Sequence, residues 1–184
     1  AGATQVVKVE VPESWKNAET EVLGTVHEGE GALIDYVNNV LVPVNSFKGM
    51  QLPVSTFEPY VTGQVPLGSS AFEKRGIAID VPVWNPENCI QCNFCSYVCP
   101  HAVIRPVVMT EEEAAAAPTD KMLDMTGMPG KQFAMSISVL DCTGCGSCAN
   151  VCPGKKGEKA LVMKSLEENL EAQKMFDFGV AQET

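Results

Sequence analysis

The cysteines of this chain all lie in two short runs with the same spacing. Each run reads C-x2-C-x2-C-x3-C-P, and each cysteine of the second run lies 53 positions after its counterpart, from 89 to 142 and from 92 to 145. The eight residues are Cys89, Cys92, Cys95 and Cys99, then Cys142, Cys145, Cys148 and Cys152. Thiolates are soft ligands that suit iron–sulfur clusters and zinc. The repeat therefore predicts two metal centres built from a duplicated unit.

The spacing within each run is a known signature of iron–sulfur ligation and favours two 4Fe-4S clusters. Three cysteines separated by two residues let a tight loop supply three corners of a cube, with backbone N–H groups turned toward the sulfurs. The fourth cysteine stands at the start of a helix and faces away, so it ligates the other cube. The expected ligand sets are Cys89, Cys92, Cys95 and Cys152 for the first cluster, and Cys142, Cys145, Cys148 and Cys99 for the second. We expect no catalytic residue.

Three other roles for the cysteines fit the spacing less well. Zinc ribbons pair their ligands as C-x2-C…C-x2-C and have no third cysteine two residues on. A disulfide framework needs an oxidising compartment, and the N-terminus shows no secretory signal. A redox-active C-x-x-C dithiol does not require eight cysteines in duplicate.

Composition limits the possible partners and compartments. The chain has 184 residues, 45% of them hydrophobic and 20% charged, as is ordinary for a globular protein. Its formal net charge of −10 argues against a nucleic-acid partner. No apolar run approaches the length that spans a membrane, so we expect no membrane partner. Reduced, metal-loaded cysteines indicate a cytoplasmic location.

The first 88 residues contain no cysteine, and residues 1–76 are expected to form a largely irregular junction region. Residues 6–11 alternate as a short strand does. A helix is expected at about 31–42, ending before Pro43. Residues 45–70 are rich in glycine, proline, serine and threonine, which predicts an extended loop draped over a larger body.

Residues 77–164 are expected to form a ferredoxin-like domain. Ile77, Ile79, Val81 and Val83 alternate along one face of a strand that ends at Trp84, and Pro82 predicts an edge strand. The first cysteine run follows, then a helical turn and a return strand at 103–109. The second half repeats this layout, with strands at 132–139 and 160–163 on either side of the second run.

An insert at about 110–131 separates the two halves. Residues 111–117 predict a short helix ended by Pro118. Met122, Met125 and Met128 predict an adaptable packing surface rather than a ligand set. Residues 165–184 are expected to be a C-terminal helix or linker. Its start carries the capping-box pattern Ser165 to Glu168, and its apolar face holds Leu166, Leu170 and Phe176.

Three single residues outside the cysteine runs were considered for function. Trp15 is expected to be a hydrophobic plug beneath a loop. His101 follows Cys99 and Pro100, where it could modulate a cluster, but a solvent-exposed histidine is the simpler interpretation. The same interpretation holds for His27.

The chain also resembles a known family, the pyruvate:ferredoxin (or flavodoxin) oxidoreductases. The resemblance is strongest from Phe72 to Cys89, which is similar to the junction before that family's ferredoxin-like domain. The junction is named for its Glu-Lys-Arg, here Glu73, Lys74 and Arg75. Further matching segments are Pro12-Glu-Ser-Trp15, Leu52-Pro-Val-Ser-Thr-Phe57 and Cys99-Pro-His-Ala-Val-Ile-Arg105.

The resemblance implies a role inside a larger enzyme. In that family a thiamine-diphosphate enzyme cleaves a 2-oxoacid with coenzyme A, and electrons leave through three 4Fe-4S clusters, two of them in the ferredoxin-like domain. This chain matches only the junction and that domain, so by itself it is not expected to oxidise pyruvate. It is expected to be a fragment of a long chain or a subunit of a split enzyme. Lys74 or Arg75 is expected to pair with carboxylates or cap carbonyls at a domain junction.

The sequence as a whole therefore predicts an α+β fold: a dicluster ferredoxin-like domain with an insert, preceded by an irregular region with a helix and an edge strand. The expected function is relay of single electrons from the thiamine site and its nearby cluster to external ferredoxin or flavodoxin. The expected partners are the remaining domains or subunits of the oxidoreductase and that external carrier. The alternatives are a self-contained dicluster carrier, an electron-transfer subunit of another redox enzyme, or a structural iron–sulfur module.

Overall fold

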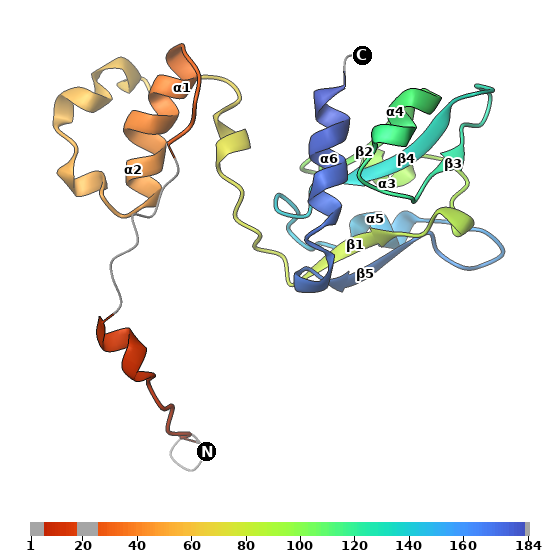
Figure 1. Ribbon diagram of the computed structural model, residues 1–184, viewed down its shortest axis with the longest axis horizontal. Helices are drawn as coiled ribbons and strands as arrows, with labels where there is room; N and C mark the ends of the chain where they lie inside the picture. Colours follow the sequence, from red (N-terminus) through yellow and green to blue (C-terminus); the bar gives the residue numbers. More distant parts are fainter. Residues whose placement is uncertain (1–5, 18–25, 183–184) are drawn as a thin grey trace. The chain divides into compact units, whose positions relative to one another are not determined.

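The computed structural model describes residues 6–17 and 26–182 and divides the chain into two units (Figure 1). Unit 1 is Ala1–Glu73 and unit 2 is Lys74–Thr184. The division falls inside the Glu73-Lys74-Arg75 triplet, three residues before the expected boundary at 76. Lys74 and Arg75 therefore belong to the unit that holds all the cysteines.

The longest helix of unit 1 runs through Pro43, so the expected end before this proline is wrong. It consists of α1 (Ala32–Tyr36), a π-helical stretch (Val37–Leu41) and α2 (Val42–Asn45) without interruption. In an α-helix the proline ring clashes with the carbonyl four residues earlier and removes one hydrogen bond. The π stretch widens the turn before the proline, and Val42 N–H bonds to Val37 O, five residues back.

The remainder of unit 1 contains short 3-10 helices at Gly49–Gln51, Val54–Tyr60 and Ser69–Phe72. The stretch 45–70 is therefore partly helical rather than extended. The strand expected at 6–11 is absent, because no described segment pairs with these residues and an isolated strand leaves its backbone groups unbonded. The plug expected at Trp15 is also wrong. This residue lies in a 3-10 turn at Glu13–Asn17 and is 69% exposed.

Unit 2 contains two small antiparallel sheets (Figure 1). The first pairs β1 (Asp80–Trp84) with β5 (Leu161–Ser165), so that Trp84 lies opposite Leu161. The second has the order β2-β4-β3, with strands at Ile104–Met109, Gln132–Ile137 and Leu123–Asp124. The first sheet joins strands that are distant in sequence, whereas β3 and β4 of the second are near neighbours along the chain. The mixture of helices and antiparallel sheets confirms the α+β class.

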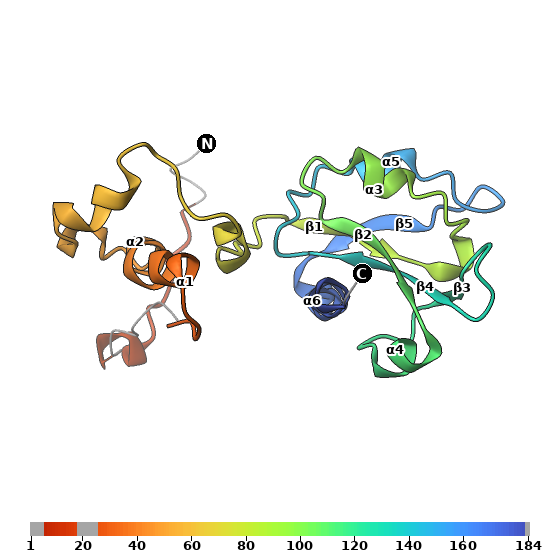
Figure 2. The same cartoon turned by 90° about the horizontal axis from the view of Figure 1, so that it is seen from above.

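Helices cover both sides of these strands (Figure 2). The short helices α3 (Phe94–Val98) and α5 (Ser147–Val151), each within a cysteine run, pack against each other on one side. Helix α6 (Ala172–Ala181) packs against β4 on the other. A continuous apolar core fills the space between the sheets; Val81, Ile104, Phe133 and Leu161 are almost completely buried in it.

The first strand of unit 2 differs from its expected pattern. Ile77 and Ile79 are 66% and 86% exposed, whereas Ala78 and Val81 are buried. The two buried residues are three positions apart, so the two-residue alternation of a strand is broken at Asp80, where β1 begins. Pro82 lies in a strand with a single partner, as expected of an edge strand.

The insert and the C-terminal helix are capped differently from expectation. Helix α4 (Glu111–Ala116) begins with a capping box that the sequence analysis missed: Glu113 N–H donates to Thr110 Oγ1 at 3.2 Å, and Thr110 N–H donates to Glu113 Oε2 at 2.7 Å. The box expected at Ser165 to Glu168 is absent, since Ser165 ends β5 and α6 begins at Ala172.

Candidate metal centres

The eight cysteines line two cavities of unit 2. The first cavity is lined by Cys89, Cys92, Cys95 and Cys152, together with Trp84, Asn93 and Met135. The second cavity is lined by Cys142, Cys145, Cys148 and Cys99, together with Pro82, His101 and Ile104. Each cavity therefore combines three cysteines of one run with the fourth cysteine of the other.

Helices α3 and α5 produce this exchange. The fourth cysteine of each run was expected at the start of a helix, and this is wrong. Cys95 lies in the first turn of α3 and Cys99 follows its end, so the helix connects the first cavity to the second. Cys148 and Cys152 stand in the same positions on α5 and connect the cavities in the opposite direction. Four residues of helix advance about 6 Å along the axis, so the two cavities are close neighbours.

Backbone N–H groups face the sulfurs at matching positions of the two loops. Gln91 N–H donates to Cys89 Sγ and Gly144 N–H donates to Cys142 Sγ, both at 3.4 Å. Both donors have left-handed backbones, with φ of 57° and 70°. Gly144 cannot carry a side chain easily, because a Cβ there would lie 3.0 Å from Asp80 O. The loops thus provide N–H···S contacts of the kind that stabilise a bound cluster.

The environment of the thiols differs from one position to the next. Burial raises the pKa of Cys95 to about 12 and that of Cys148 to about 11. Cys145 is exposed, and hydrogen bonds from Ser147 lower the pKa of its thiol. Metal ligation requires the thiolate, so the buried thiols must give up protons when a cluster binds.

The geometry of these sites fits a four-iron cube. A single Zn²⁺ draws its four sulfurs to about 2.3 Å from one point and needs no cavity. Here four thiols line each cavity together with apolar residues. Two buried polar atoms without a hydrogen-bond partner, Trp84 Nε1 and Asn93 Oδ1, belong to residues that line the first cavity. A buried polar atom left unpaired calls for an explanation, and a bound group is one.

Lys74 anchors the segment that leads into the second cluster loop. Its Nζ lies 2.5 Å from Asp141 Oδ2, and Asp141 directly precedes Cys142. Burial would raise the pKa of Asp141, but hydrogen bonds from Lys74 and Ser138 hold it below its usual value. The amide oxygen of Gln173 on α6 accepts from Leu140 N–H at 3.2 Å. Polar contacts thus connect the first residue of unit 2, the loop and α6.

We expect Lys74→Met to lower the free energy of unfolding of the cluster-loaded protein by about 1–2 kcal/mol, because Asp141 then loses its cation in a half-buried setting. Lys174→Met is the matched control. Lys174 pairs with Glu171 on the surface, where both side chains are well exposed, and its loss should change stability little. Denaturant unfolding of both variants measures the difference. Equal stability of the two variants would contradict this role for Lys74.

Other candidate residues take varied positions. His101 is exposed, yet it lines the second cavity. His27 was expected to be exposed but is half-buried in unit 1, where its ring stands edge-to-face against Phe72 at a centroid distance of 4.8 Å and its backbone bonds to the Asn38 side chain. Met122 and Met125 pack against the core of unit 2, as expected of packing residues, whereas Met128 is half exposed. Sequence reasoning missed Trp84 and Asn93 as cavity residues; their closeness to Cys89 and Cys92 was the available signal.

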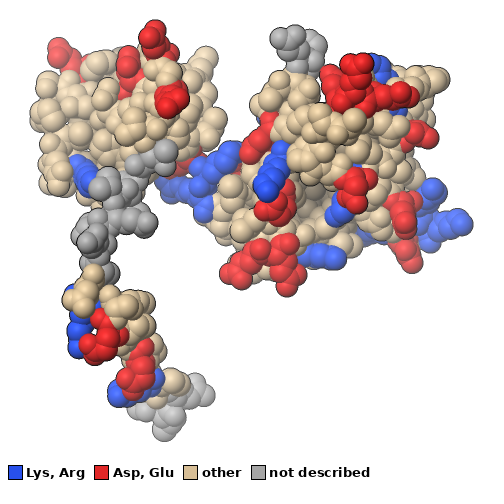
Figure 3. Space-filling model, viewed as in Figure 1, with Lys and Arg blue, Asp and Glu red and all other residues tan. Residues whose placement is uncertain are grey.

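The surface of the described residues carries mixed charge. On the face that Figure 3 shows, acidic and basic side chains are interspersed over unit 2. Within residues 6–17 and 26–182, none of the helices combines the length and apolar character needed to cross a bilayer.

Comparison with known families identifies two consecutive domains. Residues 19–78 match the EKR domain, described as a domain of unknown function, and residues 88–156 match a 4Fe-4S dicluster domain. The dicluster match indicates two 4Fe-4S clusters, in agreement with the cysteine spacing and the two cavities.

Three curated relatives contain a segment similar to this chain. The pyruvate:ferredoxin oxidoreductase of Moorella thermoacetica is 48% identical over 164 residues, which are 88% of this chain and 13% of the relative. The pyruvate-flavodoxin oxidoreductase of Enterobacter agglomerans is 40% identical over 98% of this chain and 15% of its own length. The pyruvate dehydrogenase (NADP(+)) of Cryptosporidium parvum is 45% identical over 72% of this chain and 7% of its own length.

The chain thus spans only about one seventh of the first two relatives. By these matches, it consists of an EKR domain followed by a 4Fe-4S dicluster domain and corresponds to one segment of the pyruvate:ferredoxin and pyruvate-flavodoxin oxidoreductases.

Proposed function

We propose that this chain relays single electrons through two 4Fe-4S clusters inside a 2-oxoacid oxidoreductase. The electrons come from a thiamine site and a cluster near it, which lie outside this chain, and pass to external ferredoxin or flavodoxin. The first cavity holds one cluster through Cys89, Cys92, Cys95 and Cys152. The second holds the other through Cys142, Cys145, Cys148 and Cys99.

The observation that carries this proposal is the exchange of the fourth cysteine between the cavities. Because α3 and α5 each run from one cavity to the other, each helix carries a ligand for both clusters about one helical turn apart, which makes the clusters neighbours. A short separation through packed protein allows electrons to pass between them. A bound cluster takes up and releases one electron, and N–H groups and burial set the potential at which it does so.

The names of the relatives support a relay rather than a role in acceptor choice. The three names contain different electron carriers, ferredoxin, flavodoxin and NADP(+), although each of the three relatives has a segment similar to this chain. A function common to all three is transfer of electrons within the enzyme. This favours the relay over the self-contained carrier, and nothing in this segment is proposed to bind pyruvate.

The proposal is tested on anaerobically reconstituted protein. We expect about eight iron atoms per chain and two one-electron steps in a reductive titration. The reduced protein should be reoxidised by added ferredoxin or flavodoxin, and pyruvate with coenzyme A should not reduce it.

Three results would contradict different parts of the proposal. About two zinc ions per chain with no visible absorbance would refute the clusters. A protein that binds eight iron atoms in clusters that cannot be reduced would be a structural iron–sulfur module, and this would refute the relay. Reduction by pyruvate would show that the chain itself contains a catalytic site.

A further inference from the structure

The first cavity contains polar side-chain atoms that have no partner in the protein. Among the described residues, Trp84 Nε1 and Asn93 Oδ1 are the buried side-chain nitrogen and oxygen atoms without a hydrogen bond. Trp84 is only 6% exposed, and burying an indole N–H without a partner is destabilising. Both residues line the first cavity, so whatever fills that cavity lies against their side chains.

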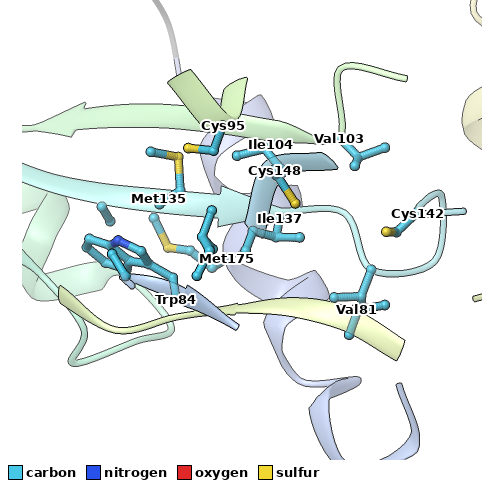
Figure 4. Packing of buried hydrophobic residues seen from close by; sticks show 14 of the residues in the cluster. Val81, Trp84, Cys95, Val103, Ile104, Met135, Ile137, Cys142, Cys148 and Met175 are labelled. Carbon is cyan, nitrogen blue, oxygen red and sulfur yellow. The ribbon is translucent and has the colours of Figure 1, made fainter. Parts of the chain in front are cut away.

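Packing holds the Trp84 ring in place. The ring stands edge-to-face against Phe133 at a centroid distance of 6.0 Å. Figure 4 shows it on the inner side of its strand, in the packed space that it shares with Met135, another residue that lines the first cavity. The N–H therefore has a fixed surrounding and cannot turn to solvent for a hydrogen bond.

Asn93 is held just as firmly at its backbone. It follows Cys92 directly and adopts a left-handed φ of 59°, so its side chain does not cap the helix that it precedes. A half-turn of the side-chain amide exchanges Oδ1 with the NH₂ group, which supplies two donors. Sulfide and thiolate accept hydrogen bonds and offer no N–H or O–H, so the donor face is the one that suits a cluster.

The second repeat lacks both donors. Trp84 lies five positions before Cys89, and the residue five positions before Cys142 is Ile137. Asn93 directly follows Cys92, and the residue that directly follows Cys145 is Gly146. By contrast, each repeat has a backbone donor at the matching position, Gln91 in the first and Gly144 in the second. Each N–H nitrogen lies 3.4 Å from a cysteine sulfur. Trp84 and Asn93 are thus specific to the first cavity. The second cavity has other polar side chains in its lining, those of His101, Thr143 and Ser147, and the two loops share only the backbone contacts.

We propose that the Trp84 indole N–H and the Asn93 side-chain amide donate hydrogen bonds to sulfur atoms of the cluster in the first cavity, and thereby set its potential. This inference rests on the crossed ligation proposed above for that cluster. Hydrogen bonds to sulfur stabilise the reduced, more negative state of a cluster and raise its potential. Both residues act as tuning residues and do not ligate iron.

The first test needs no change in the core. Trp15 and Trp84 are the two tryptophans, and Trp15 is exposed in unit 1. A Trp15→Phe protein grown with tryptophan labelled by ¹⁵N in the indole ring therefore carries the label at Trp84 alone. We expect a ¹⁵N hyperfine coupling to the reduced first cluster in pulsed paramagnetic spectra. The cluster is assigned as the signal that disappears in Cys89→Ala.

The second test compares potentials. Trp84→Phe and Asn93→Gly each remove a donor, and glycine keeps the left-handed backbone and reproduces the second repeat. Each variant should lower the potential of the first cluster and leave that of the second unchanged. Trp15→Phe, the matched control, should shift neither.

The outcomes separate this inference from the proposed function. If the first cluster never assembles in the unmutated chain, the ligation proposal fails. If it assembles but shows no ¹⁵N coupling, the Trp84 donor is refuted, whether or not Trp84→Phe folds. An unchanged first-cluster potential in Asn93→Gly refutes the Asn93 donor.

Discussion

Replacement of Cys99 by alanine is expected to remove the cluster of the second loop, not that of its own loop. Cys99 lines the cavity of Cys142, Cys145 and Cys148, whereas the other cysteines of its run line the first cavity. With three thiolates left, the second cluster should be lost or reduced to three irons. Iron content should fall from about eight to about four or seven atoms per chain.

Three companion variants make this test decisive. Cys152→Ala should damage the first cluster, and Cys89→Ala should damage that same cluster although the two residues belong to different runs. Cys142→Ala should reproduce the effect of Cys99→Ala. Paramagnetic spectra of the reduced variants distinguish the two clusters. If Cys99→Ala and Cys89→Ala abolish the same signal, the crossed ligation is wrong.

Gly154→Ala is expected to be among the most destabilising single-methyl substitutions in unit 2. Gly154 lines the first cavity two residues after Cys152 and has a φ of 62°. A Cβ there would overlap Glu158 O and lie 2.5 Å from Glu158 C and 2.8 Å from Lys159 Cα. All of these atoms are backbone, so the turn must open. We expect a loss of more than about 3 kcal/mol in stability.

Gly157→Ala is the matched control for this prediction. Gly157 lies in the same turn with a φ of 87°, but a Cβ there would meet nothing within 4 Å. Its cost should be the left-handed backbone alone, about 1–2 kcal/mol. The midpoint of thermal unfolding and the rate of loss of visible absorbance measure both variants. Equal effects would show that the overlap is relieved without opening the turn.

The sequence was most informative where local spacing and packing agree. The strands Ile104–Met109 and Gln132–Ile137 lie close to the ranges expected from the sequence, and the helix Glu111–Ala116 ends before Pro118 as expected. The helix through Pro43 was missed because a sequence does not show that a π turn can accommodate a proline. Ile77 and Ile79 were predicted to share the buried face of Val81. They lie before β1, which begins at Asp80, and the sequence does not show where the strand begins.

For a similar reason, the sequence predicted the cysteines of the candidate site but not the residues around them. The ligand residues follow from spacing, since few arrangements need the same four-cysteine run twice. Trp84 was read only as the end of a strand, because hydrophobic periodicity reports burial and not which polar atom remains unpaired. The role of Lys74 needed the position of Asp141, which is 67 residues away and has no sequence signal that links the two.

The shared construction of the two cavities has a consequence for biosynthesis. The four thiols that line the first cavity extend along the chain from Cys89 to Cys152, so the segment that leaves the ribosome first presents three thiols without the fourth. At about 5–20 residues per second, the missing thiol follows 63 positions later, after about 3 to 13 seconds. With the crossed ligation proposed above, neither cube can be completed on a nascent half-domain. We therefore expect iron delivery to follow translation of both runs.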